Sequence, residues 1–141
     1  MGLALRQAEL AAAEDEIPVG AVLVKDGVAV LADHNRTRQL ANPLAHAEKL
    51  IIDKILASKI KYLNDYSLYV TLEPCLMCSG LLILSRVGLL ALGAADPKAG
   101  ACGSVYHAPL DKSFNHHPVI VRGVLEAQCS ALLKDFFATK R

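Results

Sequence analysis

The sequence has 141 residues, of which 53% are hydrophobic and 21% are charged. This length fits one ordinary domain, and the composition excludes an intrinsically disordered chain. The longest apolar run, Val87–Ala95, is far shorter than the roughly 18 residues that a membrane span requires. The N-terminal segment is apolar and then acidic, unlike a secretion signal. We therefore expect a cytoplasmic protein, with a dense core or a large face buried against another subunit.

The formal net charge is only +1, which argues against a general polyanion binder. The charge is unevenly distributed, however. Residues 1–33 carry two basic and six acidic side chains, whereas residues 34–141 carry thirteen basic and eight acidic ones. Ordinary surface charge is the favoured interpretation, and a local basic face remains a second one.

Four cysteines stand at positions 75, 78, 102 and 129. Because no secretion signal precedes them, we expect free thiols or metal ligands rather than disulfides. Cys75 and Cys78 form a CxxC pair. Cys102 and Cys129 are isolated in the sequence, and such cysteines are usually small buried hydrophobic residues.

Hydrophobic periodicity predicts strands that alternate with helices, without an internal repeat or a linker. Asp26-Gly27 is a strong hairpin signal between two β-rich runs, and Arg36–Pro43 and Ala94–Pro118 are predicted loops. This alternation favours one α/β domain over residues 1–141, with helices on both faces of the sheet. The predicted strands are Ala21–Val24, Val28–Ala32, Leu68–Leu72, Val87–Leu92 and Val119–Val121. The predicted helices are Leu3–Ala13, Leu44–Ser58, Cys75–Leu84 and Glu126–Phe137.

Two short motifs combine into a candidate metal site. Pro74 precedes a predicted helix, so Cys75 and Cys78 fall on one face of its first turn. A helix N-terminus stabilises negative charge and so favours the thiolate form that binds metal. His46 lies near the start of another predicted helix and offers an imidazole nitrogen. Two thiolates and one imidazole suit zinc, and three protein ligands leave the fourth tetrahedral position open for catalysis.

Glu48 follows His46 by two residues, a rotation of about 200° on a helix, so the two cannot bind one ion side by side. A metal beyond the helix end can still be reached by Glu48 through a zinc-activated water. That position predicts a proton-transfer role for Glu48. The simpler alternative is a carboxylate that only stabilises the helix N-terminus.

Two alternatives use the same cysteines differently. A structural zinc module needs a fourth ligand and has no use for Glu48. A redox CxxC protein is less favoured, because Pro74 precedes the pair and Leu76-Met77 lies within it. A catalytically silent subunit is expected to lack Glu48. The residues that could complete a structural site are Cys102, Cys129, His107, His116 and His117.

The combination His46-Ala47-Glu48 and Pro74-Cys75-Leu76-Met77-Cys78 is the known motif of zinc nucleobase deaminases. The flanking segments resemble the bacterial tRNA-specific adenosine deaminases of the cytidine deaminase-like superfamily, over essentially the whole chain. These segments are Ile17–Val22, His34–Arg36, Thr71–Gly80, Ser85–Gly88, Gly93–Ser104, Asn115-His116 and Asp135–Phe137.

The resemblance implies a three-layer α/β/α fold with a mixed five-stranded sheet, a homodimer and one Zn²⁺ per subunit. It implies hydrolytic deamination of adenosine to inosine at the wobble position of a tRNA anticodon loop, a zinc-activated hydroxide attacking C6. Matched by motif, His46, Cys75 and Cys78 are the zinc ligands and Glu48 is the proton shuttle. The matched substrate-binding residues are Asn35, Asp96 and Asn115, although Asn35 on its own also fits a turn residue.

The sequence departs from the family pattern at three places. Ala95 stands where an arginine is common, which weakens the case for RNA binding. Lys49-Leu50-Ile51-Ile52 is bulkier than usual after the histidine motif, and the N-terminal helix is short. The second substrate class is therefore a free base or nucleoside, namely guanine, cytosine or cytidine, which the same zinc chemistry would deaminate.

Overall fold

The computed structural model describes residues 1–140, and Arg141 lies outside the described part. The strands are β1 (Gly20–Lys25), β2 (Val28–His34), β3 (Tyr66–Leu72), β4 (Leu89–Ala94) and β5 (Val119–Val121). They form one mixed sheet in the order β2-β1-β3-β4-β5. β1 is antiparallel to β2 and β3, whereas β3, β4 and β5 run parallel to one another.

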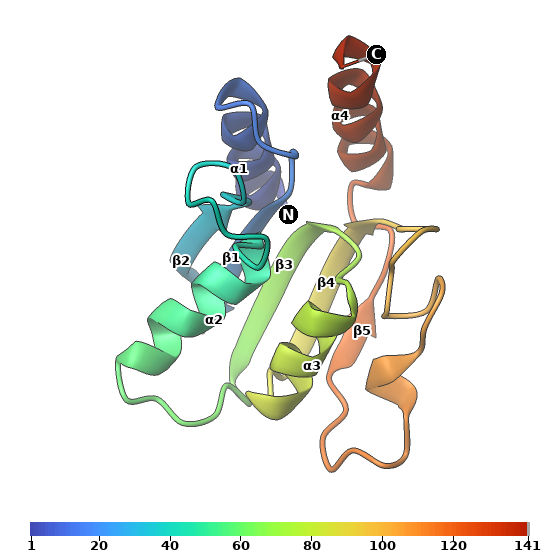
Figure 1. Cartoon of the computed structure of the whole chain (residues 1–141). Helices are drawn as coiled ribbons and strands as arrows, with labels where there is room; N and C mark the ends of the chain where they lie inside the picture. The colour runs from blue at the N-terminus through green and yellow to red at the C-terminus, as the bar shows by residue number, and fades with distance from the viewer. Residues whose placement is uncertain (141) are drawn as a thin grey trace.

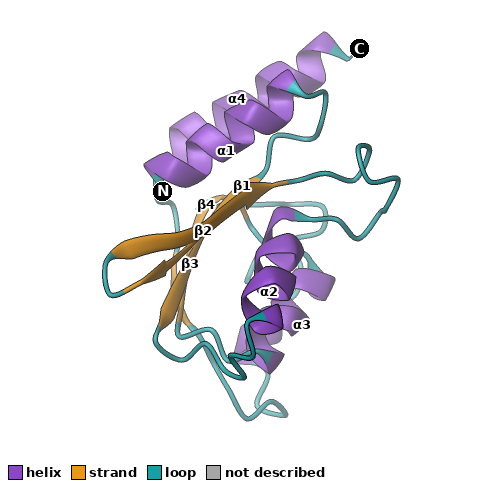
Figure 2. Cartoon of the chain, turned by 90° about the vertical axis from the view of Figure 1, so that its left-hand side faces the viewer, coloured by secondary structure: helices purple, strands orange, loops and turns teal. Residues whose placement is uncertain are grey.

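Four helices cover the two faces of this sheet. They are α1 (Gly2–Ala13), α2 (Ala47–Ala57), α3 (Leu76–Leu84) and α4 (Glu126–Thr139). α1 and α4 lie together on one face, and α2 and α3 lie on the other (Figure 1, Figure 2). The expected α/β/α fold with a mixed five-stranded sheet is confirmed. Among residues 1–140, no helix is long and apolar enough to cross a membrane.

The core lies between the sheet and the pair α2 and α3. Leu23, Leu68 and Leu90 are fully buried on three neighbouring strands, and their pairing places them side by side. Ile51 and Ile52 of α2 pack into the same core and are 0% and 1% exposed. These two bulky residues after the histidine motif therefore fill the core behind the site. Each such side chain stabilises the fold by about 1.5–3 kcal/mol.

The predicted hairpin at Asp26-Gly27 is confirmed. Both residues have positive φ, 50° and 75°, as a two-residue type I′ turn requires. The turn joins Lys25 to Val28, which are paired across β1 and β2.

Every element except β5 differs from the sequence prediction by one to three residues at one end or both. α2 begins at Ala47 rather than at Leu44, because His46 has extended φ and ψ of −74° and 150° and serves as the N-cap. β4 runs through Gly93 to Ala94 instead of ending at Leu92; a Cβ at Gly93 would lie 2.5 Å from the Cys129 sulfur, so glycine here serves close packing. The predicted loop Ala94–Pro118 contains a short 3₁₀ helix, Ala108–Leu110.

The topology brings four strand ends to one edge of the sheet. Gly20 at the start of β1 pairs with His34 at the end of β2, and Leu72 at the end of β3 pairs with Ala94 at the end of β4. Ligands bind outside the carboxyl ends of parallel strands in such sheets. A ligand site is therefore expected at this edge.

Candidate metal centre and active site

The three predicted zinc ligands come together at the N-termini of α2 and α3. His46 caps α2 and Cys75 caps α3, while Cys78 lies within the first turn of α3. The Nδ1 atom of His46 is 3.6 Å from the sulfur of Cys75 and 3.6 Å from that of Cys78. All three ligand atoms lie within 4.8 Å of one another.

These distances fit a tetrahedral zinc ion. With Zn–S of about 2.3 Å and Zn–N of about 2.0–2.1 Å, tetrahedral angles place sulfur and nitrogen about 3.5–3.6 Å apart. Within residues 1–140, the cluster consists of His46, Cys75 and Cys78, with no fourth protein ligand. Cys102, a candidate fourth ligand of a structural site, is instead buried with its sulfur 3.2 Å from the Ser79 hydroxyl. The donor set therefore matches an open site and not a closed structural one.

The two thiols have very different affinities for a proton. The hydrogen bonds that Cys75 accepts from Cys78 and from His46 lower its pKa to about 4 despite its partial burial. The same bond and burial raise the pKa of Cys78 well above its ordinary range. Zinc is bound by thiolates and by a neutral imidazole, so its affinity for this site increases with pH.

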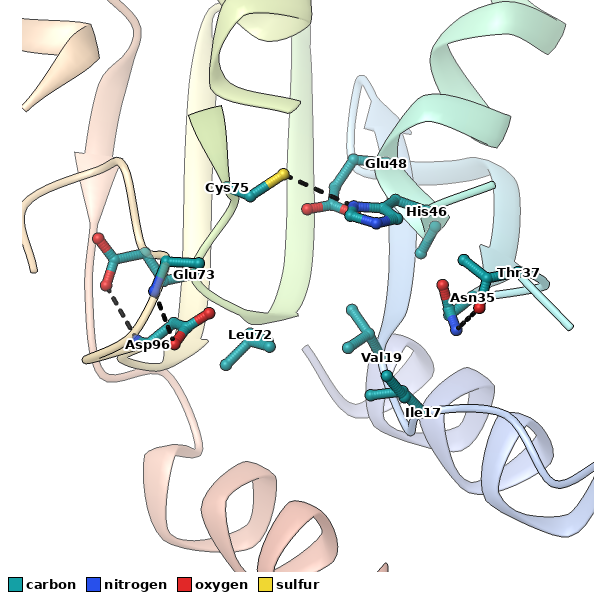
Figure 3. A pocket seen from close by; sticks show the side chains of 12 residues that line it. Ile17, Val19, Asn35, Thr37, His46, Glu48, Leu72, Glu73, Cys75 and Asp96 are labelled. Atoms are coloured by element: carbon teal, nitrogen blue, oxygen red, sulfur yellow. Dashed lines mark hydrogen bonds between the residues drawn. The ribbon is translucent and has the colours of Figure 1, made fainter. Parts of the chain in front are cut away.

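Glu48 occupies the first turn of α2 and is 4% exposed. Figure 3 shows its carboxylate beside the His46 ring, turned toward the same space as Cys75. Burial raises the pKa of Glu48 above its ordinary value. A carboxylate in this setting can take up and release a proton closer to neutral pH than an exposed one.

His46, Glu48 and Cys75 line a cavity of about 190 Å³. Its remaining wall comes from the strand ends at the sheet edge and the loops beside them, where Val19 and Leu72 contribute apolar side chains (Figure 3). This is the combination expected of a ligand site, namely an apolar pocket with a few converging polar groups.

The predicted substrate-binding residues lie in different places. Asn35 and Asp96 both line the cavity, whereas Asn115 is exposed and is not part of its lining. Asp96 also accepts backbone N–H bonds from Lys98 and Ala99 through Oδ1, at 2.9 and 3.2 Å, and so shapes its own turn. The substrate roles of all three remain predictions.

Sequence reasoning missed the carboxylate of Glu73, which is 2% exposed and lines the cavity. It accepts the backbone N–H groups of Asp96, Cys102 and Ser104 at 3.1, 2.9 and 3.0 Å, and also the Ser104 hydroxyl. Glu73 thereby fixes the loop that closes one side of the site. Its position directly before Pro74-Cys75 was the available signal.

Replacing Glu73 by glutamine is expected to destabilise the fold by about 1–3 kcal/mol. The glutamine NH₂ group would face buried N–H or O–H donors that now bond a carboxylate oxygen. Burial alone would raise the pKa of Glu73, but the bonds from Ser104, Asp96 and Cys102 outweigh it and lower that pKa. The stability advantage of wild type over the variant is therefore fully present above the unfolded-state pKa of Glu73. It disappears as pH falls through the lower folded-state pKa. Urea unfolding of both proteins between pH 7 and pH 3 measures this, and a difference independent of pH would contradict it.

A family model for the cytidine and deoxycytidylate deaminase zinc-binding region matches residues 1–94. The chain belongs to this family. All three candidate ligands lie inside the matched residues, so the cofactor of the site is zinc, one ion per subunit. A tRNA-specific adenosine deaminase from Bacillus subtilis (strain 168) is 40% identical over 139 residues, which are 98% of this chain and 86% of the relative.

Two solved structures extend the comparison. One comes from work on A-to-I editing by tRNA:A34 deaminases at the wobble position of transfer RNA. It has a TM-score of 0.89 and 40% identity, covering 94% of this chain and 97% of the other. The other is a guanine deaminase from Nitrosomonas europaea, with a TM-score of 0.80 and 25% identity, covering 97% and 82%. Proteins named for the deamination of different bases therefore share this fold.

Proposed function

We propose that this chain is a zinc-dependent deaminase that converts adenosine at the wobble position of a tRNA anticodon loop to inosine. The main support for this substrate is the 40% identity, across nearly the whole chain, to relatives named for tRNA adenosine deamination. The guanine deaminase is only 25% identical, so the free-base alternative has weaker support. We also infer one deaminase domain over residues 1–141 and a cytoplasmic location.

The cavity itself supports a single nucleobase as the group that enters. Its volume of about 190 Å³ is below the roughly 300–1,000 Å³ of sites for drug-sized ligands. An adenosine within an RNA chain would reach such a cavity by leaving the base stack, as other deaminase substrates do. Unpaired loop bases are the least costly to extrude.

The proposed reaction replaces the C6 amino group of adenine by oxygen, consuming one water and releasing one ammonia. Zinc held by His46, Cys75 and Cys78 supplies a Lewis acid that makes water nucleophilic at neutral pH. Glu48 takes a proton from the attacking water and donates it to the ring, and it then carries a proton to the departing amino group as the C6–N bond breaks. Its raised pKa suits both directions of transfer.

Specificity for the wobble position is tested with two anticodon stem-loop RNAs. One has its single adenosine at the wobble position, and the other has it at the next loop position. We expect inosine, measured after nuclease digestion, from the first RNA and little from the second. Equal conversion of both would contradict wobble specificity while leaving adenosine deamination intact.

We further propose a homodimer. Leu76 of α3 is 50% exposed and lines a groove together with Tyr106 and Leu110. Leu84, the last residue of the same helix, is 72% exposed. Apolar side chains grouped in this way are a common feature of protein–protein interfaces. The high hydrophobic fraction of the sequence is consistent with such a face.

Sedimentation of the protein is expected to give twice the 15.1 kDa chain mass. The double variant Leu84→Glu, Leu110→Glu is expected to shift it toward the monomer, because charges would be buried at the contact. Val28→Glu is the matched control, since Val28 is 63% exposed at the hairpin. A wild-type protein that sediments as a monomer would overturn the dimer.

A further inference from the structure

The carboxylate of Glu16 is 0% exposed and holds the loop that carries Asn35. Its Oε1 atom accepts the backbone N–H groups of Arg38 and Gln39 at 2.7 and 2.8 Å. Its Oε2 atom accepts the side-chain amide nitrogen of Asn35 at 3.0 Å and the Thr37 hydroxyl at 3.2 Å. Both oxygens of Glu16 therefore accept two hydrogen bonds each, all from residues 35–39.

This arrangement determines which way the Asn35 amide points. The amide nitrogen of Asn35 faces Glu16 and donates to its Oε2 atom. The second hydrogen of that nitrogen is directed to Thr37 Oγ1, at 3.2 Å. Figure 3 shows the nitrogen of Asn35 turned toward Thr37, with the oxygen on the other side of the amide. Because Asn35 lines the cavity, its oxygen is the atom offered to a ligand.

We propose that Glu16, acting through Asn35, makes this wall of the cavity an acceptor for the ribose 2′-hydroxyl of the target nucleotide. The inference rests on the proposed function. An adenosine inside an RNA chain has two hydrogen-bond donors, the 6-amino group and the 2′-hydroxyl, because its 3′ and 5′ oxygens are phosphate esters. The amino group is lost at the metal centre. An acceptor at Asn35 therefore selects the 2′-hydroxyl, the group that distinguishes RNA from DNA.

The substitution Glu16→Gln tests the orientation directly. The backbone N–H groups of Arg38 and Gln39 can only donate, so they retain the glutamine oxygen. The glutamine NH₂ then faces the amide nitrogen of Asn35, donor against donor. Asn35 must turn its amide over and present nitrogen to the cavity, so the acceptor is lost without a change in side-chain size.

The experiment measures kcat/KM on a stem-loop RNA with adenosine or 2′-deoxyadenosine at the target position. Four proteins are compared: wild type, Glu16→Gln, Asn35→Ala and the double variant. We expect wild type to prefer the ribose about tenfold, as one hydrogen bond allows. Each single variant should lower activity on the ribose substrate and bring the preference toward one. In the Asn35→Ala background, Glu16→Gln should have no further effect, since both act through one contact.

Asp15→Asn is the matched control, because Asp15 is the adjacent carboxylate and bonds the side chains of Arg38 and Lys140. Its ribose preference should equal that of wild type. An active wild type whose preference survives Asn35→Ala, or a Glu16→Gln effect that is as large without Asn35 as with it, overturns this inference alone. An inactive wild type overturns the proposed function and this inference with it. If Glu16→Gln does not fold, the comparison of wild type with Asn35→Ala still tests whether Asn35 accepts a hydrogen bond from the 2′-hydroxyl.

Discussion

Replacing Glu48 by glutamine is expected to reduce deamination by about 10²–10⁴-fold, the usual contribution of positioned acid–base catalysis. Glutamine has nearly the same shape as glutamate but cannot carry a proton. Because Glu48 lies beside the metal ligands and not among them, zinc content and the unfolding temperature should remain close to wild type. The measurements are the rate of inosine formation, the zinc content per chain and thermal unfolding.

Glu126→Gln is the matched control for this variant. Glu126 also lies in the first turn of a helix, α4, but it is exposed and does not line the cavity. A role limited to stabilising a helix N-terminus would give both variants a small and similar loss of stability. Normal turnover of Glu48→Gln would remove Glu48 from the mechanism.

The second large effect is expected at the metal ligands. Cys75→Ser or Cys78→Ser should release zinc and abolish activity together, because serine is a poor zinc ligand and His46 with one thiolate makes an incomplete site. Retained stoichiometric zinc in either variant would contradict the ligand assignment. Removal of zinc by a chelator should inactivate wild type in the same way, and added zinc should restore it.

Cys129→Ser is the control for these two variants. Cys129 is buried beside Gly93 and is not part of the ligand cluster. Its substitution should leave the zinc content at one ion per chain. A moderate loss of stability is the only expected change, since serine adds a hydroxyl to an apolar site.

The metal centre could be predicted from sequence because the placement of its two cysteines depends on their short spacing in the chain. Two cysteines three residues apart at a helix start must lie on one side of the first turn, and the structure places both sulfurs 3.6 Å from His46 Nδ1. The hairpin was equally local, since Asp26-Gly27 supplies the positive φ angles that its turn requires. Helix starts were less accurate, because an N-cap residue follows the same hydrophobic pattern without having helical dihedral angles.

The roles of the buried carboxylates Glu16 and Glu73 could not be predicted in the same way. Glu16 bonds partners 19 to 23 residues away, and Glu73 bonds partners 23 to 31 residues away. Those partners are mostly backbone N–H groups of irregular loops. Such contacts produce no recognisable pattern in composition or hydrophobic periodicity. Each of the two carboxylates organises a loop at the cavity, so part of the site depends on tertiary contacts alone.

The uneven charge of the chain also has a tertiary explanation. The acidic residues that end the α1 segment contact the loop after β2: Asp15 pairs with Arg38, and Glu14 approaches Arg36. Much of the N-terminal negative charge is therefore neutralised within the molecule. The remaining positive charge lies elsewhere on the chain, including exposed Lys98 in the cavity loop that carries Ala95.

The proposed substrate is an adenosine within an RNA chain. The most direct measurement compares kcat/KM for an anticodon stem-loop RNA, free adenosine, cytidine, cytosine and guanine with the same zinc-loaded protein, following inosine and ammonia. We expect conversion of the stem-loop to exceed that of every small substrate by at least about 10²-fold, since binding energy from the surrounding RNA is used in the transition state. Faster deamination of guanine, cytosine, cytidine or free adenosine than of the stem-loop would contradict it.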